Sequence, residues 1–284
     1  MSHAFCITAY ADFEQLSALL SLLSPSYACF VHIDAKSAVP EAFLRQWSGH
    51  PQVFLHSSQR ILWGSYRHVL AVMELLRAAQ QKGPYTFYHI ISENTFPICT
   101  QSEFEDFFNA QPGRNFLELT RSAAQDPQAK RTRYFYFQHL YNARSRTGYR
   151  IERVLLAGQR FLHVRRSFRP EYKGYLYCHL SREFVGWLFD NDSLWRKYLR
   201  QLKYCYAGEE YFFQNLLMQS PFAPTAQNDP LIYDLWDDPD RGLPAVLDAR
   251  DLPMLQSSGK LFARKFSSAC KQPTEYFSQA FHSQ

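Results

Sequence analysis

The sequence of 284 residues predicts an α/β fold in which helices flank a mostly parallel sheet. Two observations lead to this expectation. Short apolar runs typical of buried strands alternate with longer segments of helical periodicity, which is the order of βαβ units. Hydrophobic residues make up 46% of the chain and no internal repeat or low-complexity tract interrupts it, so one sizeable core is expected.

The first 120 residues carry the clearest alternation of strands and helices. An opening βαβ unit is predicted from strand 5–8, helix 13–23 and strand 28–33. The elements expected next are helix 43–47, strand 53–56, helix 66–79, strand 86–92, helix 101–108 and strand 115–119. Ligands of such sheets bind at the carboxyl ends of the strands, so Asp34 and residues 92–95 fall at the expected binding edge.

The second half of the chain is less regular. Residues 123–133 predict a loop, 174–188 a strand followed by a helix, and 221–253 a proline-rich stretch, with a loose tail after Phe266. The segment 144–169 interleaves Arg with Tyr, Leu and Val, which is typical of a solvated helix face. A surface for anionic lipid or for an acceptor is the alternative interpretation of that segment.

Two adjacent carboxylates, Glu209 and Glu210, stand at the start of an aromatic-rich amphipathic helix within residues 207–217. Gly208 ends the preceding segment, and the helix dipole favours negative charge in a first turn. Most first-turn Glu residues only complement that dipole, so the pair becomes a candidate catalytic base only with support from elsewhere in the chain.

The composition excludes some partners and permits others. The net charge of +5 and the pI near 8.8 are mildly basic, which fits an anionic small molecule. Nucleic acid is not expected as a partner, because no clustered basic footprint typical of such proteins is present. The aromatic content of 17% permits the stacking of sugar rings on exposed Tyr and Trp.

The cysteines and the N-terminus predict a cytoplasmic protein. The six cysteines are scattered through mostly apolar runs with no C-x-x-C pair, which indicates reduced, buried thiols. The N-terminal residues lead directly into a strand, without a basic leader or an apolar span of membrane length. Peripheral association with the inner face of a membrane remains compatible with this interpretation.

Several motifs, each weak alone, occur in a specific order. They read Cys29-Phe30-Val31-His32-Ile33-Asp34-Ala35-Lys36-Ser37, Ser92-Glu93-Asn94-Thr95-Phe96-Pro97-Ile98, Gly174 to Leu188, and Gly259-Lys260-Leu261-Phe262-Ala263-Arg264-Lys265-Phe266. In this order the chain resembles the core-2/I-branching β-1,6-N-acetylglucosaminyltransferases and the related peptide O-xylosyltransferases, in a compact bacterial form. The resemblance implies one GT-A glycosyltransferase domain over residues 1–284, with a nucleotide-binding half at about 1–120 and an acceptor and catalytic half at about 121–284.

The resemblance also implies roles for named residues. Glu210 aligns with the family's catalytic base, and Glu209 would orient the loop. Asp34 and Thr8 align with positions that contact the uridine. Lys265, with Arg241 and Arg264, would bind the diphosphate. For the acceptor sugar, the aligned residues are Glu118, Lys130, Arg133 and Trp236.

No metal or other cofactor is expected. The Asp-x-Asp motif that holds a metal in most GT-A enzymes would follow residue 92, where the chain has Glu93-Asn94-Thr95. The family uses basic side chains instead. The acidic runs 190–192 and 237–240 mimic metal motifs; the first is interpreted as a solvated helix end, and the second is kept as an alternative metal site.

The predicted function is that of an inverting, metal-independent glycosyltransferase with a UDP-sugar donor. The resemblance favours transfer of N-acetylglucosamine in β-1,6 linkage to a bacterial glycan or lipid-linked oligosaccharide. The residues Glu93 to Thr95, and Tyr10 in place of the family's usual His, depart from the family pattern near the sugars. Transfer of xylose or another sugar, and a catalytically inactive carbohydrate-binding protein, are the alternatives.

Overall fold

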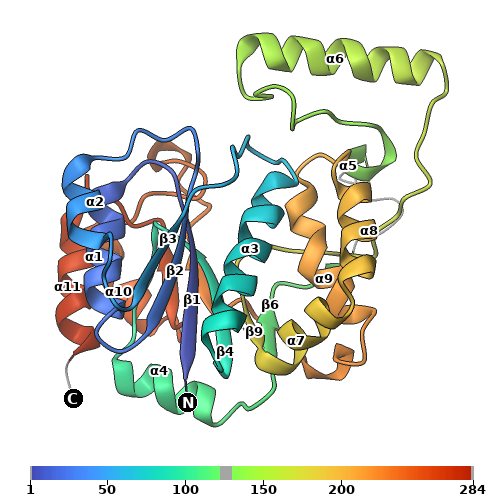
Figure 1. Ribbon diagram of the computed structural model, residues 1–284. Helices are drawn as coiled ribbons and strands as arrows, with labels where there is room; N and C mark the ends of the chain where they lie inside the picture. Colours follow the sequence, from blue (N-terminus) through green and yellow to red (C-terminus); the bar gives the residue numbers. More distant parts are fainter. Residues whose placement is uncertain (1, 122–129, 283–284) are drawn as a thin grey trace.

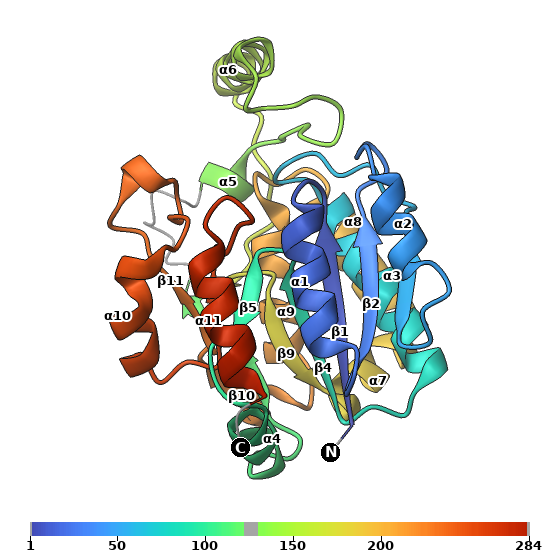
Figure 2. The same ribbon diagram turned by 90° about the vertical axis from the view of Figure 1, so that its left-hand side faces the viewer.

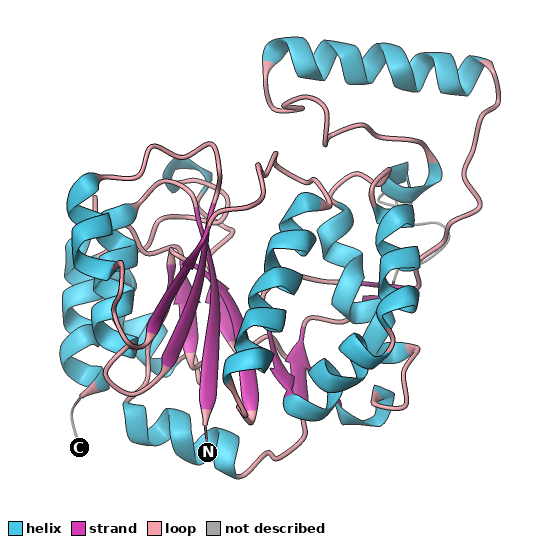
Figure 3. Cartoon of the chain, viewed as in Figure 1, coloured by secondary structure: helices cyan, strands magenta, loops and turns pink. Residues whose placement is uncertain are grey.

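The computed structural model describes residues 2–121 and 130–282 and is built around a seven-stranded sheet (Figures 1 and 3). The strand order is β10-β6-β9-β4-β1-β2-β3. These strands are β1 (His3–Ala9), β2 (Ala28–Ile33), β3 (Val53–His56), β4 (Phe87–Ser92), β6 (Asn115–Leu117), β9 (Cys178–Ser181) and β10 (Ala226–Asn228). All neighbours pair in parallel except β9, which is antiparallel to β4 and β6. The predicted α/β class with a mostly parallel, mixed sheet is thus confirmed.

Helices cover both faces of this sheet (Figure 1). One layer holds α1 (Phe13–Leu23), α2 (Glu41–Trp47), α4 (Gln101–Asn109), α10 (Leu252–Ser257) and α11 (Lys271–Phe281). The other holds α3 (Arg67–Lys82), α7 (Arg182–Asp190), α8 (Asp192–Leu202) and α9 (Phe212–Met218). Strand β1 is buried along its whole length because Phe5 and Ile7 enter the first layer while Ala4 and Cys6 enter the second.

A smaller, three-stranded sheet lies beside the large one and contributes Arg264 to the cleft described below. It comprises β11 (Ile232–Asp234), β12 (Phe262–Arg264) and β5 (Thr95–Pro97), in that order. The parallel register of β11 and β12 sets Asp234 opposite Arg264. The pair β7 (Thr120–Arg121) and β8 (Tyr172–Lys173) forms a separate two-stranded ribbon.

Three expectations about local structure were wrong. The chain after Phe266 is not a loose tail, because α11 buries Phe277 and Phe281 one turn apart against the core. Glu209 and Glu210 lie in a 3₁₀ helix, η2 (Gly208–Tyr211), that precedes α9, rather than in the first turn of an α-helix. The predicted loop at 123–133 ends in a short helix, α5 (Lys130–Arg133), and residues 122–129 lie outside the described residues.

The proline-rich stretch also contains more structure than the sequence predicts. Besides β10, β11 and α10, it contains the short helices η3 (Ala223–Thr225), η4 (Pro239–Arg241) and η5 (Ala249–Asp251).

Helix α6 (Arg146–Phe161) stands away from the rest of the molecule, beyond the edge where the parallel strands end (Figures 1 and 2). No described helix is long and apolar enough to span a bilayer. All six cysteines are free thiols, four of them buried.

Candidate functional site

A cleft of about 460 Å³ opens at the carboxyl ends of β1, β2 and β4. It is lined by the strand-end residues Thr8, Ala9, Tyr10, Asp34, Lys36, Ser92, Glu93 and Asn94, and by Ile61, Trp63, Gly64, His68, Arg144, Tyr175, Leu176, Tyr177, Glu209, Glu210, Trp236, Leu243, Pro244, Arg264 and Lys265. Six of the site residues predicted from the sequence lie in this wall: Thr8, Asp34, Glu210, Trp236, Arg264 and Lys265. The topology thus brings together residues that are far apart in the sequence.

Asp34 follows β2 directly and is buried in the wall of the cleft. Its Oδ1 accepts hydrogen bonds from the backbone N–H groups of Lys36 (3.1 Å) and Ile61 (3.3 Å). Its Oδ2 lies 3.2 Å from the Lys36 ammonium. A carboxylate has about four acceptor positions, so Asp34 is held in place and can still accept one more hydrogen bond from a ligand.

Thr8 and His68 lie on the same side of the cleft and contact each other. The Thr8 hydroxyl is 3.2 Å from Nε2 of His68. Burial lowers the pKa of His68 to about 4, so this imidazole is neutral near pH 7. The backbone carbonyl of Thr8 accepts from the N–H of Glu93, which ties the ends of β1 and β4 together at 3.0 Å.

Glu93 is the carboxylate that stands where a metal-binding Asp-x-Asp motif would begin. It is buried, and desolvation raises its pKa to about 7. Its Oε1 accepts from the backbone N–H of Tyr10 at 3.4 Å. Among the described residues, no group of three or more His, Cys, Asp or Glu side chains is arranged to hold a metal ion.

Two cations at the end of β12 face the cleft. Nε of Arg264 lies 3.8 Å from Oδ1 of Asp234, and its guanidinium carbon lies 4.8 Å from the centre of the Tyr177 ring. Lys265 is half-buried and has no ion-pair partner within the described residues. Burial lowers the pKa of the Lys265 ammonium, and the charges of Arg264 and Arg144 lower it further. The carboxylates of Asp234 and Glu93 act in the opposite direction. A lysine without an ion-pair partner at this position suits an anionic ligand.

The two carboxylates of η2 occupy different environments. Nη1 of Arg131 donates to Oε2 of Glu210 at 2.6 Å. Burial raises the pKa of Glu210, while Arg131 acts in the opposite direction. Oε2 of Glu209 is buried without a hydrogen-bond partner among the described residues. Burial raises the pKa of Glu209 to about 8, so its carboxyl group is largely protonated at neutral pH.

The loop before β9 holds Glu210 in position. The backbone N–H of Gly174 donates to the Glu210 carbonyl at 2.8 Å. A Cβ atom at residue 174 would lie 2.0 Å from the carbonyl oxygen of Glu118, so only glycine fits this approach.

Aromatic side chains form the more open part of the cleft. The rings of Tyr175 and Trp236 are stacked, with centroids 6.5 Å apart, and Trp236 is 46% exposed. On another side, the Arg144 guanidinium lies 4.0 Å from the centre of the Trp63 ring. Exposed aromatic faces of this kind are available for stacking with a sugar ring.

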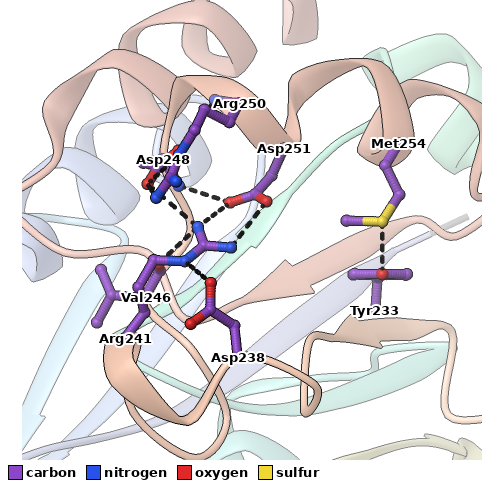
Figure 4. Close-up of polar contacts among 8 residues, drawn as sticks. All are labelled: Tyr233, Asp238, Arg241, Val246, Asp248, Arg250, Asp251 and Met254. Carbon is purple, nitrogen blue, oxygen red and sulfur yellow. Dashed lines mark hydrogen bonds and ion pairs between the residues drawn. The ribbon is translucent and has the colours of Figure 1, made fainter.

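Arg241, which the resemblance assigns to the diphosphate, is not among the residues that line the cleft. Its guanidinium is enclosed by three carboxylates, those of Asp238 (2.6 Å), Asp251 (2.7 Å) and Asp248 (3.1 Å) (Figure 4). These bonds raise the pKa of Arg241 further above its ordinary value. The positive charge is therefore compensated within the fold, and Asp238 is engaged in an ion pair with Arg241.

Three predicted acceptor residues also lie outside the wall of the cleft. The carboxylate of Glu118 accepts from the backbone N–H of Tyr175 at 3.1 Å. Lys130 and Arg133 lie at the two ends of α5 and so share one side of a helical turn. Arg131 is rotated about 100° from Lys130 around the helix axis, and its side chain reaches Glu210. Within the predicted Lys-x-x-Arg segment, it is therefore Arg131 that pairs with Glu210.

Several lining residues were missed by the sequence interpretation, including Lys36, Trp63, His68, Arg144 and Tyr175. Lys36 and Tyr175 lie within quoted motifs, so proximity to Asp34 and to the Gly174 segment could have indicated them. Trp63 and Arg144 come from segments without a motif, and only the fold brings them to the cleft.

One protein family, described as Branch: Core-2/I-Branching enzyme, has a model that matches residues 3–253. The match confirms the family resemblance inferred from the motifs. Together with the observed sheet, it also confirms the predicted GT-A glycosyltransferase fold. Arg264 and Lys265 lie beyond the matched span.

A curated relative, beta-glucuronosyltransferase GlcAT14A of Arabidopsis thaliana, is 24% identical over 264 residues, covering 87% of this chain. The chain spans 57% of the length of that relative. Glycosyltransferase GlyE of Streptococcus pneumoniae TIGR4 aligns over 98% of this chain and 60% of its own, with 10% identity and a TM-score of 0.46. Mouse xyloside xylosyltransferase 1 aligns over 92% of this chain and 96% of its own, with 15% identity and a TM-score of 0.40.

Proposed function

Because the chain belongs to the Core-2/I-branching enzyme family of glycosyltransferases, we propose that it transfers a sugar, with inversion and without a metal, from a UDP-sugar to a glycan or lipid-linked oligosaccharide. One observation carries the proposal. A single cleft collects a buried carboxylate after β2, a lysine after β12 and a carboxylate of η2. These are the three kinds of group that nucleotide recognition, leaving-group stabilisation and base catalysis require.

In the proposed reaction, Glu210 takes the proton from the attacking acceptor hydroxyl. The acceptor oxygen forms a bond to the anomeric carbon as the bond from that carbon to the phosphate oxygen breaks on the opposite face. The electron pair of the breaking bond leaves with UDP. Lys265 and Arg264 would stabilise the negative charge that develops on the diphosphate.

Glu210 suits the role of base better than Glu209 does. A general base must be ionised when the acceptor binds. The Arg131 charge favours the ionised form of Glu210, whereas Glu209 has an unpaired carboxyl oxygen and a pKa near 8. Glu209 is therefore proposed to position the η2 loop.

For the nucleotide, Asp34 would accept a hydrogen bond from the uracil N–H, and Thr8 would lie beside the uridine. The fixed position of Asp34 supports this assignment, because two backbone N–H groups hold its Oδ1. On the acceptor side, Trp236 and Tyr175 supply the exposed aromatic surface. Glu118 contacts the backbone of Tyr175 and would act there through that residue.

The proposed donor is UDP-N-acetylglucosamine and the proposed linkage β-1,6, as the family resemblance suggests. Xylose or another sugar is the alternative, and the glucuronosyltransferase among the relatives adds UDP-glucuronic acid to the candidates. A lipid-linked acceptor would place the enzyme at the cytoplasmic face of a bacterial membrane.

A donor-hydrolysis panel tests the proposal. Purified protein is incubated with UDP-N-acetylglucosamine, UDP-xylose, UDP-glucuronic acid and UDP-glucose, and released UDP is measured. Release from one donor that Glu210→Gln abolishes supports the transferase and identifies its sugar. UDP binding by calorimetry without release from any donor, even with added glycan acceptors, would favour the inactive carbohydrate-binding alternative.

A further inference from the structure

The exposed helix α6 has one face directed toward the protein and another face without a partner. Gly148 is the buried residue of this helix, and a Cβ there would lie 2.0 Å from the carbonyl oxygen of Asn142. The Gln159 side chain donates to the carbonyl of Phe135 (2.9 Å) and accepts from the same residue's N–H (2.8 Å). The orientation of the helix about its axis is therefore specified by close contacts.

Another side of the helix is apolar and exposed to solvent. At about 3.6 residues per turn, Val154, Phe161, Ile151, Leu162 and Leu155 fall on one continuous side, on which Val154 and Phe161 lie far from Gly148 and Gln159 and Leu155 lies next to them. Phe161 is 82% exposed, Val154 72% and Leu162 69%, and the other two are also exposed. If α6 were an ordinary surface helix with this side in contact with solvent alone, the side would carry polar residues.

Arginines flank the apolar side. Arg146, Arg150, Arg153 and Arg160 form a stripe along one edge of it. Residues 130–170 carry eleven Lys and Arg residues, while Glu152, which lies near the protein-facing side, is the only carboxylate. An apolar stripe bordered by arginines is the pattern of helices that lie in the interface of an anionic bilayer.

We propose that α6 docks on an anionic lipid bilayer, with Val154 and Phe161 inserted at the level of the headgroups and the arginines paired with lipid phosphates. Charge complementarity favours this occupant over a second copy of the chain, because a second copy would present a net positive surface. This binding does not depend on the proposed function. Because Arg144, two residues before α6, lines the cleft, docking would also bring the cleft close to lipid-linked acceptors, and that step rests on the proposed function.

Vesicle flotation tests the proposal on the full chain. We expect binding to vesicles of phosphatidylglycerol and phosphatidylcholine, and much weaker binding to phosphatidylcholine alone. Arg150→Gln/Arg153→Gln should lower the partition coefficient roughly twentyfold, because each basic residue near an anionic surface contributes roughly fivefold. Val154→Ser/Phe161→Ser should lower it at least roughly tenfold.

Matched variants keep the test specific. Lys197→Gln/Arg200→Gln removes two exposed charges from α8, and Leu44→Ser/Leu194→Ser changes two exposed leucines outside α6. Both should bind vesicles like the wild type. All four double variants replace exposed side chains, and their thermal melting is compared to exclude unfolding.

Two results would overturn the proposal. Equal binding to both kinds of vesicle, or equal loss in the α8 and α6 charge variants, would mean that α6 is not an anionic-lipid surface. Absence of vesicle binding together with self-association that Val154→Ser/Phe161→Ser abolishes in sedimentation velocity would assign the apolar face to a second copy of the chain.

Discussion

The guanidinium of Arg131 lies 2.6 Å from the Glu210 carboxylate, and each of the two side chains is 27% exposed. Burial alone would favour the neutral form of Glu210, and the adjacent positive charge opposes this effect. Glu209, next in the chain, has its pKa raised to about 8 because burial outweighs the opposing contribution of Arg131. Arg131 thus opposes the effect of burial at both carboxylates, but it donates its hydrogen bond to Glu210, so the two neighbours lie in different environments.

The first prediction follows from this difference. Glu210→Gln should lower the rate of transfer by on the order of 10²–10⁴, because it removes the proton acceptor, while the amide oxygen can still accept the hydrogen bond from Arg131. UDP affinity, measured by calorimetry, should stay near the wild-type value. Glu209→Gln serves as the matched control and should retain most of the activity. The reverse order of effects would assign the base to Glu209.

The pH dependence of kcat/KM tests the role of Arg131. Its charge lowers the pKa of Glu210, so Arg131→Gln should raise that pKa. Because the base acts in its ionised form, the acidic limb of the pH profile should then move to higher pH. Arg131→Lys retains a positive charge and should keep the limb closer to the wild-type position. An identical limb in all three proteins would show that another group produces it.

The succession of strands and helices along the first half of the chain could be predicted because its strands are short and strongly apolar and alternate regularly with helices. β2 was predicted with its observed bounds, and the strand-end rule then placed Asp34 at the binding edge. The end of the chain could not be predicted in this way. The helix α11 is stabilised by burying Phe277 and Phe281 in the distant core layer of α1, a tertiary contact that local composition does not reveal.

The site residues likewise fall into those whose positions could be predicted from the sequence and those whose positions could not. Asp34 follows a buried strand, so the strand-end rule could place it at the cleft, whereas Thr8 and Lys265 were assigned through the family resemblance, and all three line the cleft. Arg131 was missed because the contact that it makes depends on which side of one helical turn faces η2. The position of Arg241 outside the cleft was not foreseen, because it depends on ion pairs with Asp248 and Asp251, seven and ten residues later in the chain.

Metal removal provides a third prediction. If Lys265 and Arg264 stabilise the departing diphosphate, UDP release and transfer should continue at an unchanged rate in excess EDTA. The comparison is made with the same protein dialysed and then supplied with Mn²⁺ or Mg²⁺. Loss of activity with chelator and recovery with either metal would contradict metal independence, and Asp237→Asn would then be the first variant to examine.

The Arg241 ion-pair network should stabilise the fold without contributing to nucleotide binding. Arg241→Gln leaves Asp251, which is buried, without its guanidinium partner. The free energy of unfolding should fall by about 1–3 kcal/mol, between the values typical of exposed and of fully buried pairs. UDP affinity at a temperature well below unfolding should be unchanged. A large loss of UDP affinity in a protein that still melts cooperatively would restore Arg241 as a nucleotide ligand.

Lys265 should affect the nucleotide through its charge. It faces the cleft and has no ion-pair partner within the described residues, so a diphosphate would be its first counterion. Hydrogen bonds to charged groups contribute about 1.5–3 kcal/mol, and Lys265→Ala should therefore weaken UDP binding roughly ten- to hundredfold. Calorimetry with UDP and with uridine separates this effect from damage to the uracil pocket. Lys265→Ala should leave uridine binding intact, whereas Asp34→Ala should weaken the binding of both ligands.

Lys260→Ala is the matched control for this last experiment. Lys260 lies two residues before β12, and its ammonium is paired with Asp229 at 2.8 Å, away from the cleft. Lys260→Ala and Lys265→Ala each remove one positive charge from the same segment, so the two variants have the same net charge. UDP affinity should therefore fall only in Lys265→Ala. Equal UDP affinity in Lys265→Ala and the wild type would show that the segment from Phe262 to Phe266 has a structural role, and the assignment of the diphosphate to this end of the cleft would be wrong.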